Sequence, residues 1–171
     1  VKIKIIPRLT DTESIKTALL SYKKTLKAEI DDIIEQESSK IKIETVNNEE
    51  QKSEKELKEM AEDLPVVKIV DTLISHAILQ GASDVHIEPQ ENSLIVRYRI
   101  DGILRDAMTL PKNSSAAITA RIKVLSNLKL DEKRLPQDGR FKIIQDDQKV
   151  SFRVSTLPTY FGEKTVIRIL K

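Results

Sequence analysis

The second half of the sequence alternates apolar and polar residues in short segments, and this pattern limits the possible folds more than any other feature. The segments cover residues 85–88, 94–100, 103–110, 140–145, 149–156 and 164–170. Alternation with a period of two is typical of strands that bury one face. Asp101 and Gly102 follow the second segment, and this pair is typical of a tight hairpin turn. We therefore expect a mainly antiparallel sheet.

A strand over residues 1–8 and a long helix over about residues 12–37 are predicted before these segments. The apolar residues of the helix recur at helical spacing, and Thr10 and Glu13 form a capping-box pattern at its start. The same apolar stripe also fits a coiled-coil partner. Residues 38–62 are rich in charged and small polar residues, which is typical of a linker, although residues 53–60 also fit a helix.

Two packing helices complete the pattern. Asp63 can cap one of them, which has Pro65 in its first turn, and Gly81 fits the left-handed position that ends a helix. The other begins after a cap at Asn113 or Ser114. The order of helix, strands, helix and strands predicts an α+β fold with a mainly antiparallel sheet and packing helices.

The composition excludes several kinds of site. The chain has no cysteine, so it has no disulfide, no Cys-ligated zinc and no thiol nucleophile. The two histidines, His76 and His86, lack a metal-binding spacing, and no metal site is expected. No apolar run reaches the roughly 18–20 residues of a transmembrane helix, and we expect no signal peptide. We therefore expect a cytoplasmic protein without a transmembrane segment.

The glycines argue against a nucleotide site within this chain. The chain has four of them, and they stand far apart, at Gly81, Gly102, Gly139 and Gly162. Neither a G-x-x-x-x-G-K-[ST] loop nor a G-x-G-x-x-G turn is therefore present to hold phosphates. No grouping of residues suggests a catalytic triad or an acid–base pair. The sequence predicts that this chain alone is not an enzyme and holds no cofactor.

Arginine is the notable basic residue of the strand region. The last part of the chain carries Arg134, Arg140, Arg153 and Arg168. A guanidinium group can bind phosphate or carboxylate through two parallel hydrogen bonds. This part of the chain is therefore suited to meeting an anion.

Alternation also predicts the direction of the strand arginines. Arg153 and Arg168 alternate with apolar residues, so they face away from the core, as do Arg97 and Arg99 on an earlier strand. Ion pairs with surface acids would explain each arginine separately, and such pairs contribute little stability. The acids considered as partners are Asp101, Asp138, Glu163 and similar surface acids.

Several motifs, in this order, resemble one protein family. They are Asp63-Leu-Pro-Val-Val-Lys-Ile-Val-Asp71, Gln80-Gly-Ala-Ser-Asp-Val-His-Ile-Glu-Pro89, Val96-Arg-Tyr-Arg-Ile-Asp-Gly102, Arg134-Leu-Pro-Gln-Asp-Gly-Arg140, Arg153-Val-Ser-Thr156 and Gly162-Glu-Lys-Thr-Val-Ile-Arg168. Together they resemble the second N-terminal domain of the bacterial type II secretion and type IV pilus assembly ATPases. Residues 1–37 are similar in outline to the end of the preceding N-terminal domain.

The resemblance implies a PAS-like domain over residues 63–171, with a RecA-like ATPase domain beyond the chain. Members of the family work as cytoplasmic hexamers at the inner membrane, together with platform or adaptor proteins. They convert ATP hydrolysis into pseudopilus or pilus assembly. ATP and magnesium would belong to the ATPase domain, where the Walker A lysine lies.

By the same resemblance, Arg153 and Arg168 are expected to contact the nucleotide phosphates held by the ATPase domain. Arg134 and Arg140 are weaker candidates, for the nucleotide or for a contact between domains. An arginine supplied by a mobile domain would couple the nucleotide state to the orientation of that domain.

Three alternatives stay open. A single-stranded nucleic-acid-binding module also fits arginines on an open sheet, but three Phe, three Tyr, no Trp and a net charge of +2 disfavour it. A sensory PAS-like domain would need a small-molecule pocket, whereas the core positions are filled by aliphatic residues. A retraction or archaeal member of the superfamily is the nearest alternative, and the Pro-Gln-Asp-Gly-Arg motif favours the assembly and secretion branch.

Overall fold

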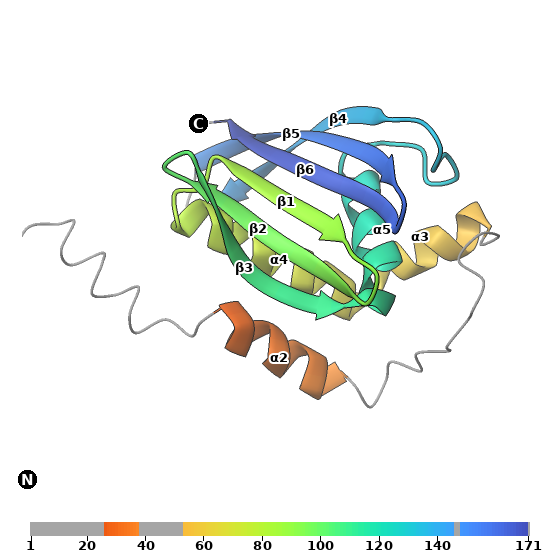
Figure 1. Cartoon of the computed structure of the whole chain (residues 1–171), viewed down its shortest axis with the longest axis horizontal. Helices are drawn as coiled ribbons and strands as arrows, with labels where there is room; N and C mark the ends of the chain where they lie inside the picture. The colour runs from red at the N-terminus through yellow and green to blue at the C-terminus, as the bar shows by residue number, and fades with distance from the viewer. Residues whose placement is uncertain (1–25, 38–52, 146–147, 171) are drawn as a thin grey trace, which may run out of the picture.

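The protein has an α+β fold in which packing helices cover one face of a six-stranded antiparallel sheet (Figure 1). The structure is a computed structural model that describes residues 26–37, 53–145 and 148–170. The strand order is β3-β2-β1-β6-β5-β4, so β1 and β6 join the two halves of the sheet. The predicted fold class and antiparallel sheet are confirmed, while the PAS-like label stays a prediction.

The helices are α2 (Leu26–Glu37), α3 (Glu54–Glu62), α4 (Leu64–Leu79) and α5 (Ser115–Leu125), and a short 3₁₀ turn, η1 (Lys112–Ser114), precedes α5. The strands are β1 (Asp84–Pro89), β2 (Ser93–Ile100), β3 (Ile103–Pro111), β4 (Gln137–Gln145), β5 (Gln148–Thr159) and β6 (Gly162–Leu170). Every predicted strand of the second half is present, and β4, β5 and β6 are longer than the alternation indicates. Within the described residues, no helix is long and apolar enough to span a membrane.

The turn between β2 and β3 has the predicted conformation. Asp101 and Gly102 have φ values of 51° and 79°, and Ile100 pairs directly with Ile103. Two consecutive residues with positive φ are what a tight turn between right-twisted strands requires, and aspartate and glycine tolerate that conformation. The hairpin therefore sets the pairing of β2 with β3 from the turn to Arg97 and Asp106, beyond which an irregularity between Val96 and Arg97 shifts the register.

The core lies between the sheet and the helices. Phe141 of β4 and Phe152 of β5 stack with their ring centres 4.6 Å apart. The hydroxyl of Tyr98 donates to the backbone oxygen of Leu73 at 2.8 Å, so this buried polar group is paired. Burial raises the pKa of Tyr98. Fully buried aliphatic residues fill the rest of the core: Leu73, Val85, Ile87, Leu94, Val96, Ile118, Ile122 and Ile167.

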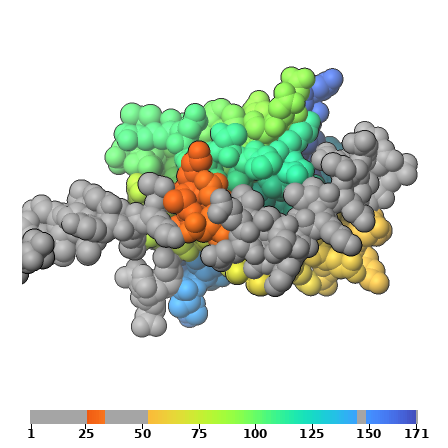
Figure 2. Space-filling view, turned by 90° about the horizontal axis from the view of Figure 1, so that it is seen from below, coloured from red at the N-terminus to blue at the C-terminus, as the bar shows by residue number. Residues whose placement is uncertain are grey.

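Helix α2 packs against this domain through its apolar stripe. Leu26 and Ile30 are 4% and 0% exposed and belong to the main core, where α2 contacts α4 and β3. Figure 2 shows α2, in orange, on the outside of the molecule beside the green surface. The stripe that fits a coiled coil is thus covered by the same chain at these two positions. The rest of the predicted helix and the strand over residues 1–8 lie outside the described residues.

Helix α3 lies at the end of the predicted linker. Ser53 caps it, since its hydroxyl accepts from the backbone of Glu56 while the Glu56 carboxylate accepts from the backbone of Ser53 at 2.8 Å. Leu57 and Ala61 are buried in a second, smaller cluster with residues of α5 and the loop that follows it. The stretch 53–60 therefore forms a capped helix, as its pattern allowed, with Ser53 as the cap and the helix continuing to Glu62. Residues 38–52 lie outside the described residues, and the domain boundaries stay predictions.

The predicted ends of the other helices are only partly correct. Pro65 lies in the first turn of α4, and Gly81 has a φ of 66° just beyond the helix, as expected. Asp63 precedes α4, but its side chain makes no capping hydrogen bond, so the predicted cap is wrong. Ser114 precedes α5, but its hydroxyl donates to the Pro111 carbonyl at 2.7 Å instead of capping the helix. The 3₁₀ turn already gives the amide of Ser115 a partner, the Lys112 carbonyl.

Candidate functional site

A single row of charged residues crosses the sheet on the face away from the packing helices. In the strand register, Arg99 lies opposite Asp84, Asp84 opposite Arg168, Arg168 opposite Arg153, and Arg153 opposite Arg140. Directly opposed residues of antiparallel strands point to the same face and lie close together. We call these five residues the arginine row.

Asp84 neutralises part of this row. Its side chain is only 6% exposed, and its carboxylate accepts a hydrogen bond from Arg168 Nε at 2.9 Å and from the Ser83 hydroxyl at 2.9 Å. Arg99 Nε lies 3.5 Å from the carboxylate oxygen that accepts from Ser83, and Arg168 binds the other oxygen. Burial alone would raise the pKa of Asp84, but these donors and the charges of Arg168 and Arg99 outweigh it and hold the pKa below the usual value. Asp84 is therefore ionised at neutral pH.

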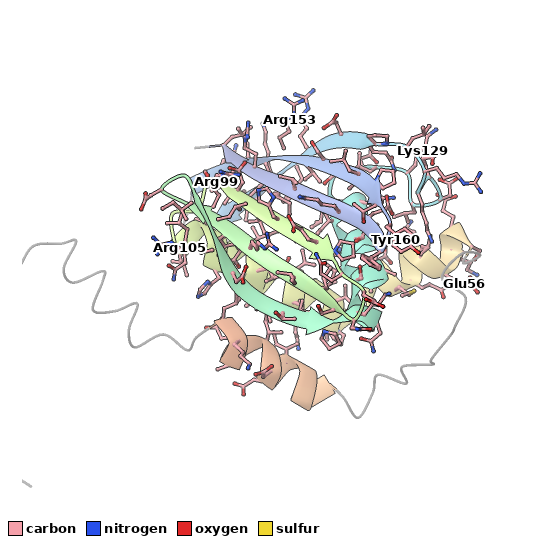
Figure 3. All side chains as sticks on the ribbon, viewed as in Figure 1. Glu56, Arg99, Arg105, Lys129, Arg153 and Tyr160 are labelled. Atoms are coloured by element: carbon pink, nitrogen blue, oxygen red, sulfur yellow. The ribbon has the colours of Figure 1, made fainter. Side chains whose placement is uncertain are left out.

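The other end of the row is not neutralised. Arg140 and Arg153 are exposed, and neither forms an ion pair or a hydrogen bond with another side chain among the described residues. Figure 3 shows Arg153 pointing away from the sheet. Asp138, in the neighbouring row, accepts from the Ser155 hydroxyl. Because like charges directly opposite one another are destabilising, this end of the row is suited to binding an anion.

A second cluster on the same face balances its charges through ion pairs, although His86 Nδ1 and Arg97 Nε are buried there without a hydrogen-bond partner among the described residues. Glu88 lies 2.7 Å from Lys164 Nζ and 3.6 Å from a terminal nitrogen of Arg97, whose Nε lies 3.2 Å from Asp106. Burial alone would raise the pKa of Glu88. The hydrogen bond and charge of Lys164 and the charge of Arg97 outweigh burial, so the pKa lies below its usual value. His86 Nδ1 is 3.7 Å from Glu88, and burial and Lys164 lower the pKa of His86. Acids and bases here compensate each other, so this cluster is structural.

The surface acids considered in the sequence as arginine partners have other roles. Asp101 occupies the hairpin turn, Asp138 binds Ser155, and Glu163 lies 2.6 Å from the buried Lys123. The acids that do pair with arginines are Asp84, Glu88 and Asp106. Among the described residues, ion pairs between arginines and acids are therefore present as suggested, but not at the three acids that were named, because the strand register selects the partners.

Arg134 lies apart from the arginine row. It lines a hollow of about 830 Å³ together with Lys112, Tyr160 and other residues near the turn between β5 and β6. Along β5, Thr159 at that turn is about 20 Å from Arg153, at 3.3 Å per residue. In Figure 3, Tyr160 and Arg99 accordingly lie at opposite ends of the sheet. Of the four predicted arginines, the structure brings Arg140, Arg153 and Arg168 together, whereas Arg134 lies elsewhere.

The sequence did not single out Asp84 or Arg99 as members of this site. Alternation already places both on the outer face, but only the pairing of β1 with β6 brings Asp84 against Arg168, a residue 84 positions away in the chain. A second hollow, of about 850 Å³, lies between α2, α4 and β2–β3 and does not reach the row. Among the described residues, no group of three or more His, Asp or Glu side chains is arranged to hold a metal ion.

Comparison with known proteins gives consistent matches. Residues 59–171 match the model of a family described as "Type II/IV secretion system protein". The type IV pilus assembly ATPase PilB of Myxococcus xanthus is 40% identical over 158 residues, which are 92% of this chain and 27% of that protein. The type II secretion system protein E of Xanthomonas campestris is 39% identical over 153 residues, which are 85% of this chain and 27% of that protein.

The matched region is a minor part of these relatives. This chain spans about a quarter of the length of the curated relatives named above. The PilB of Thermus thermophilus is 50% identical over 104 residues, which are 61% of this chain and 12% of that protein. A crystal structure of the pilus retraction motor PilT with bound ADP covers 60% of this chain and 29% of its own, at a TM-score of 0.44 and 20% identity.

Proposed function

The chain belongs to the type II/IV secretion system protein family, and on that premise we propose that it is a regulatory and assembly domain of a secretion or pilus-assembly ATPase. In this proposal, a RecA-like ATPase domain of the same protein binds ATP and magnesium. The present chain supplies arginines to that nucleotide site. ATP turnover is thereby coupled to domain motion that drives pseudopilus or pilus assembly.

The observation that carries the proposal is the uncompensated charge at one end of the arginine row. Arg153 lies directly between Arg140 and Arg168, and its guanidinium has no acidic partner among the described residues. A phosphoryl group in transfer carries negative charge on several oxygens, and arginines brought from outside can stabilise it. Arg153 and Arg168 are the proposed phosphate contacts, and Arg140 supports them from β4.

Arg134 has a different place in this proposal. Because Arg134 lies near the β5–β6 turn, at the other end of the strands from the row, we assign it to a contact between domains rather than to the nucleotide. We further propose that the whole protein is a cytoplasmic hexamer at the inner membrane, in contact with platform or adaptor proteins. The matches to pilus assembly ATPases and to a type II secretion protein at similar identity support this class of partner.

The test uses a protein that carries this chain together with its ATPase domain. Replacing Arg153 or Arg168 with alanine is expected to lower ATP turnover by about a hundredfold, the usual effect of removing one donor that stabilises transition-state charge. The fold should stay intact, because both side chains are exposed. Turnover is measured by phosphate release, and folding by circular dichroism.

A matched control comes from the paired cluster. Arg97→Ala removes an arginine from the same face that is already engaged by Glu88 and Asp106, so turnover should change little. Unchanged turnover in both Arg153→Ala and Arg168→Ala would refute the proposed nucleotide role. Equal losses in all three variants would point to a general electrostatic effect instead.

The nucleic-acid alternative has weaker support. Modules that bind single strands stack bases on aromatic side chains. Within the described residues, Phe141, Phe152 and Tyr98 are buried in the core, and the exposed Tyr160 lies at the far turn rather than beside the row. Salt-dependent binding of a labelled oligonucleotide at micromolar protein concentration would favour that alternative over an ATPase domain.

A further inference from the structure

We propose that Asp84 is a positioning residue of the nucleotide site: its buried carboxylate holds Arg168, and with it Arg99, in the orientation in which Arg168 meets a phosphate. This inference rests on the proposed function and adds to it a residue and a mechanism. Asp84 does not touch the phosphate. It acts through the guanidinium groups on either side of it.

Asp84 holds the arginines on both neighbouring strands, and we call this carboxylate the anchor. Both carboxylate oxygens are engaged, one by Arg168 Nε at 2.9 Å and the other by the Ser83 hydroxyl at 2.9 Å and by Arg99 Nε at 3.5 Å. A buried carboxylate with every contact satisfied by a donor has few alternative arrangements. The carboxylate is therefore a fixed point on β1 to which the two flanking strands attach their arginines.

The bond to Asp84 leaves the terminal nitrogens of the Arg168 guanidinium available to a phosphate. Asp84 takes the Nε–H, which lies on one edge of the guanidinium, while the side chain as a whole remains 66% exposed. The hydrogen bond and the β6 backbone therefore hold the guanidinium at two points. A free arginine side chain loses rotamer entropy when it is fixed. Fixing Arg168 before the phosphate arrives removes part of that cost from the binding step.

Arg99 is held in a similar way at the other side of the anchor. Its Nε faces Asp84, and a terminal nitrogen donates to the Gly102 carbonyl at 3.0 Å, so its side chain is fixed against the β2–β3 turn. It supplies a second positive charge against Asp84, which leaves Arg168 only partly neutralised. The assembly of one acid between two arginines keeps a net positive charge at this point of the row.

Positioning and simple electrostatics predict opposite changes in the strength of anion binding when Asp84 is neutralised. Asp84→Asn removes a negative charge next to the proposed phosphate site, so long-range attraction alone would strengthen anion binding. If Asp84 positions Arg168, the same change frees Arg168 and weakens the contact. The direction of the effect therefore separates the two explanations.

The experiment compares variants of the protein that includes the ATPase domain. For Asp84→Asn we expect kcat/KM for ATP to fall at least about tenfold, with most of the loss in kcat, since misplaced catalytic groups cost mainly in the transition state. Glu88→Gln removes the same charge from the same face of β1 but outside the row, and kcat/KM should stay within about twofold. An unchanged or raised kcat/KM in Asp84→Asn would overturn the positioning role.

A second measurement uses the present chain and does not depend on turnover. In nitrogen-15 NMR spectra, the Nε–H protons of Arg168 and Arg99 should exchange slowly with water in the wild type and rapidly in Asp84→Asn, while Arg153 exchanges rapidly in both. Rapid exchange at Arg168 in the wild type would refute the anchor. If Asp84→Asn does not fold, Ser83→Ala, which removes one donor to Asp84, should accelerate exchange at both arginines, and no change would refute it.

The outcomes distinguish this inference from the proposed function. If Arg153→Ala and Arg168→Ala leave turnover unchanged, the nucleotide role fails whatever Asp84 does. If Arg168→Ala lowers turnover but Asp84→Asn does not, only the positioning role fails.

Discussion

The positive charge of Arg153, in the arginine row, should lower the stability of the isolated chain. We predict that Arg153→Gln raises the free energy of unfolding, even though it removes a residue proposed to contact phosphate. Arg153 lies directly opposite Arg140 on one side and Arg168 on the other. Glutamine keeps much of the length and polarity of arginine without the charge, so the main change is the loss of repulsion.

The expected gain in the free energy of unfolding follows from the two contacts of Arg153, with Arg140 and with Arg168. Unit charges about 6 Å apart in water repel each other by about 0.7 kcal/mol. Like charges directly opposite one another on neighbouring strands have effects of about 0.2–1 kcal/mol per pair. Asp84 already compensates Arg168, so that contact contributes less than the one with Arg140. We expect a stabilisation of about 1 kcal/mol, which corresponds to a rise in Tm of about 2–4 °C.

Urea unfolding at low and high sodium chloride measures this effect. The screening length is about 30 Å at 0.01 M salt and about 3 Å at 1 M, so salt should stabilise the wild type and have less effect on Arg153→Gln. Arg97→Gln is the control, because Arg97 is paired with Glu88 and Asp106. It should lower the free energy of unfolding by up to about 1 kcal/mol.

Two results would refute the reasoning. One is a destabilised Arg153→Gln at low salt, which would mean that Arg153 makes favourable contacts in the isolated chain. The other is an equal response to salt in wild type and variant, which would mean that repulsion within the row is negligible. Confirmation would place Arg153 among residues whose functional role lowers the stability of the fold.

Two further predictions concern buried charges. Lys123 is 1% exposed and lies 2.6 Å from Glu163, so Lys123→Met should lower the free energy of unfolding by about 3 kcal/mol, because it leaves that acid unpaired. In urea unfolding, adding Glu163→Gln should recover more than half of this loss. No recovery would show that the loss comes from packing. Because the pKa of Asp84 is lowered in the folded protein, its stabilising effect is present above the unfolded value of about 4 and is lost as the pH falls through the folded pKa. The pH dependence of unfolding below about pH 4 should therefore be shallower in Asp84→Asn, and an identical dependence would contradict the assignment.

Local patterns in the sequence predicted the strands and the faces to which their side chains point. Alternation alone predicts that Arg153 points to the face of the sheet opposite to that of its buried neighbour Phe152. The hairpin at Asp101 and Gly102 could also be predicted, since few other residue pairs accept positive φ at both positions. These features depend only on neighbouring residues.

The composition of the arginine row could not be predicted in this way. It depends on β1 inserting between β2 and β6, a pairing between segments far apart in the chain. Without that register, Asp84 is one acid among many, and Asp138 is as reasonable a partner for an arginine. The role of Ser114 was also missed, because the 3₁₀ turn before α5 brings the Pro111 carbonyl within reach of the Ser114 hydroxyl, which donates to it and makes no capping bond to α5.

The cross-strand placement of the arginines has a mechanical consequence. Arg140, Arg153 and Arg168 come from three adjacent strands, about 4.8 Å apart, and the hydrogen bonds of the sheet fix these spacings. Arginines on a loop could release a bound anion one after another. The backbone positions in this row cannot move separately, so tilting the sheet by a small angle would withdraw all of them together. Contact with a bound anion would then be all-or-none, and it would report the orientation of the whole domain.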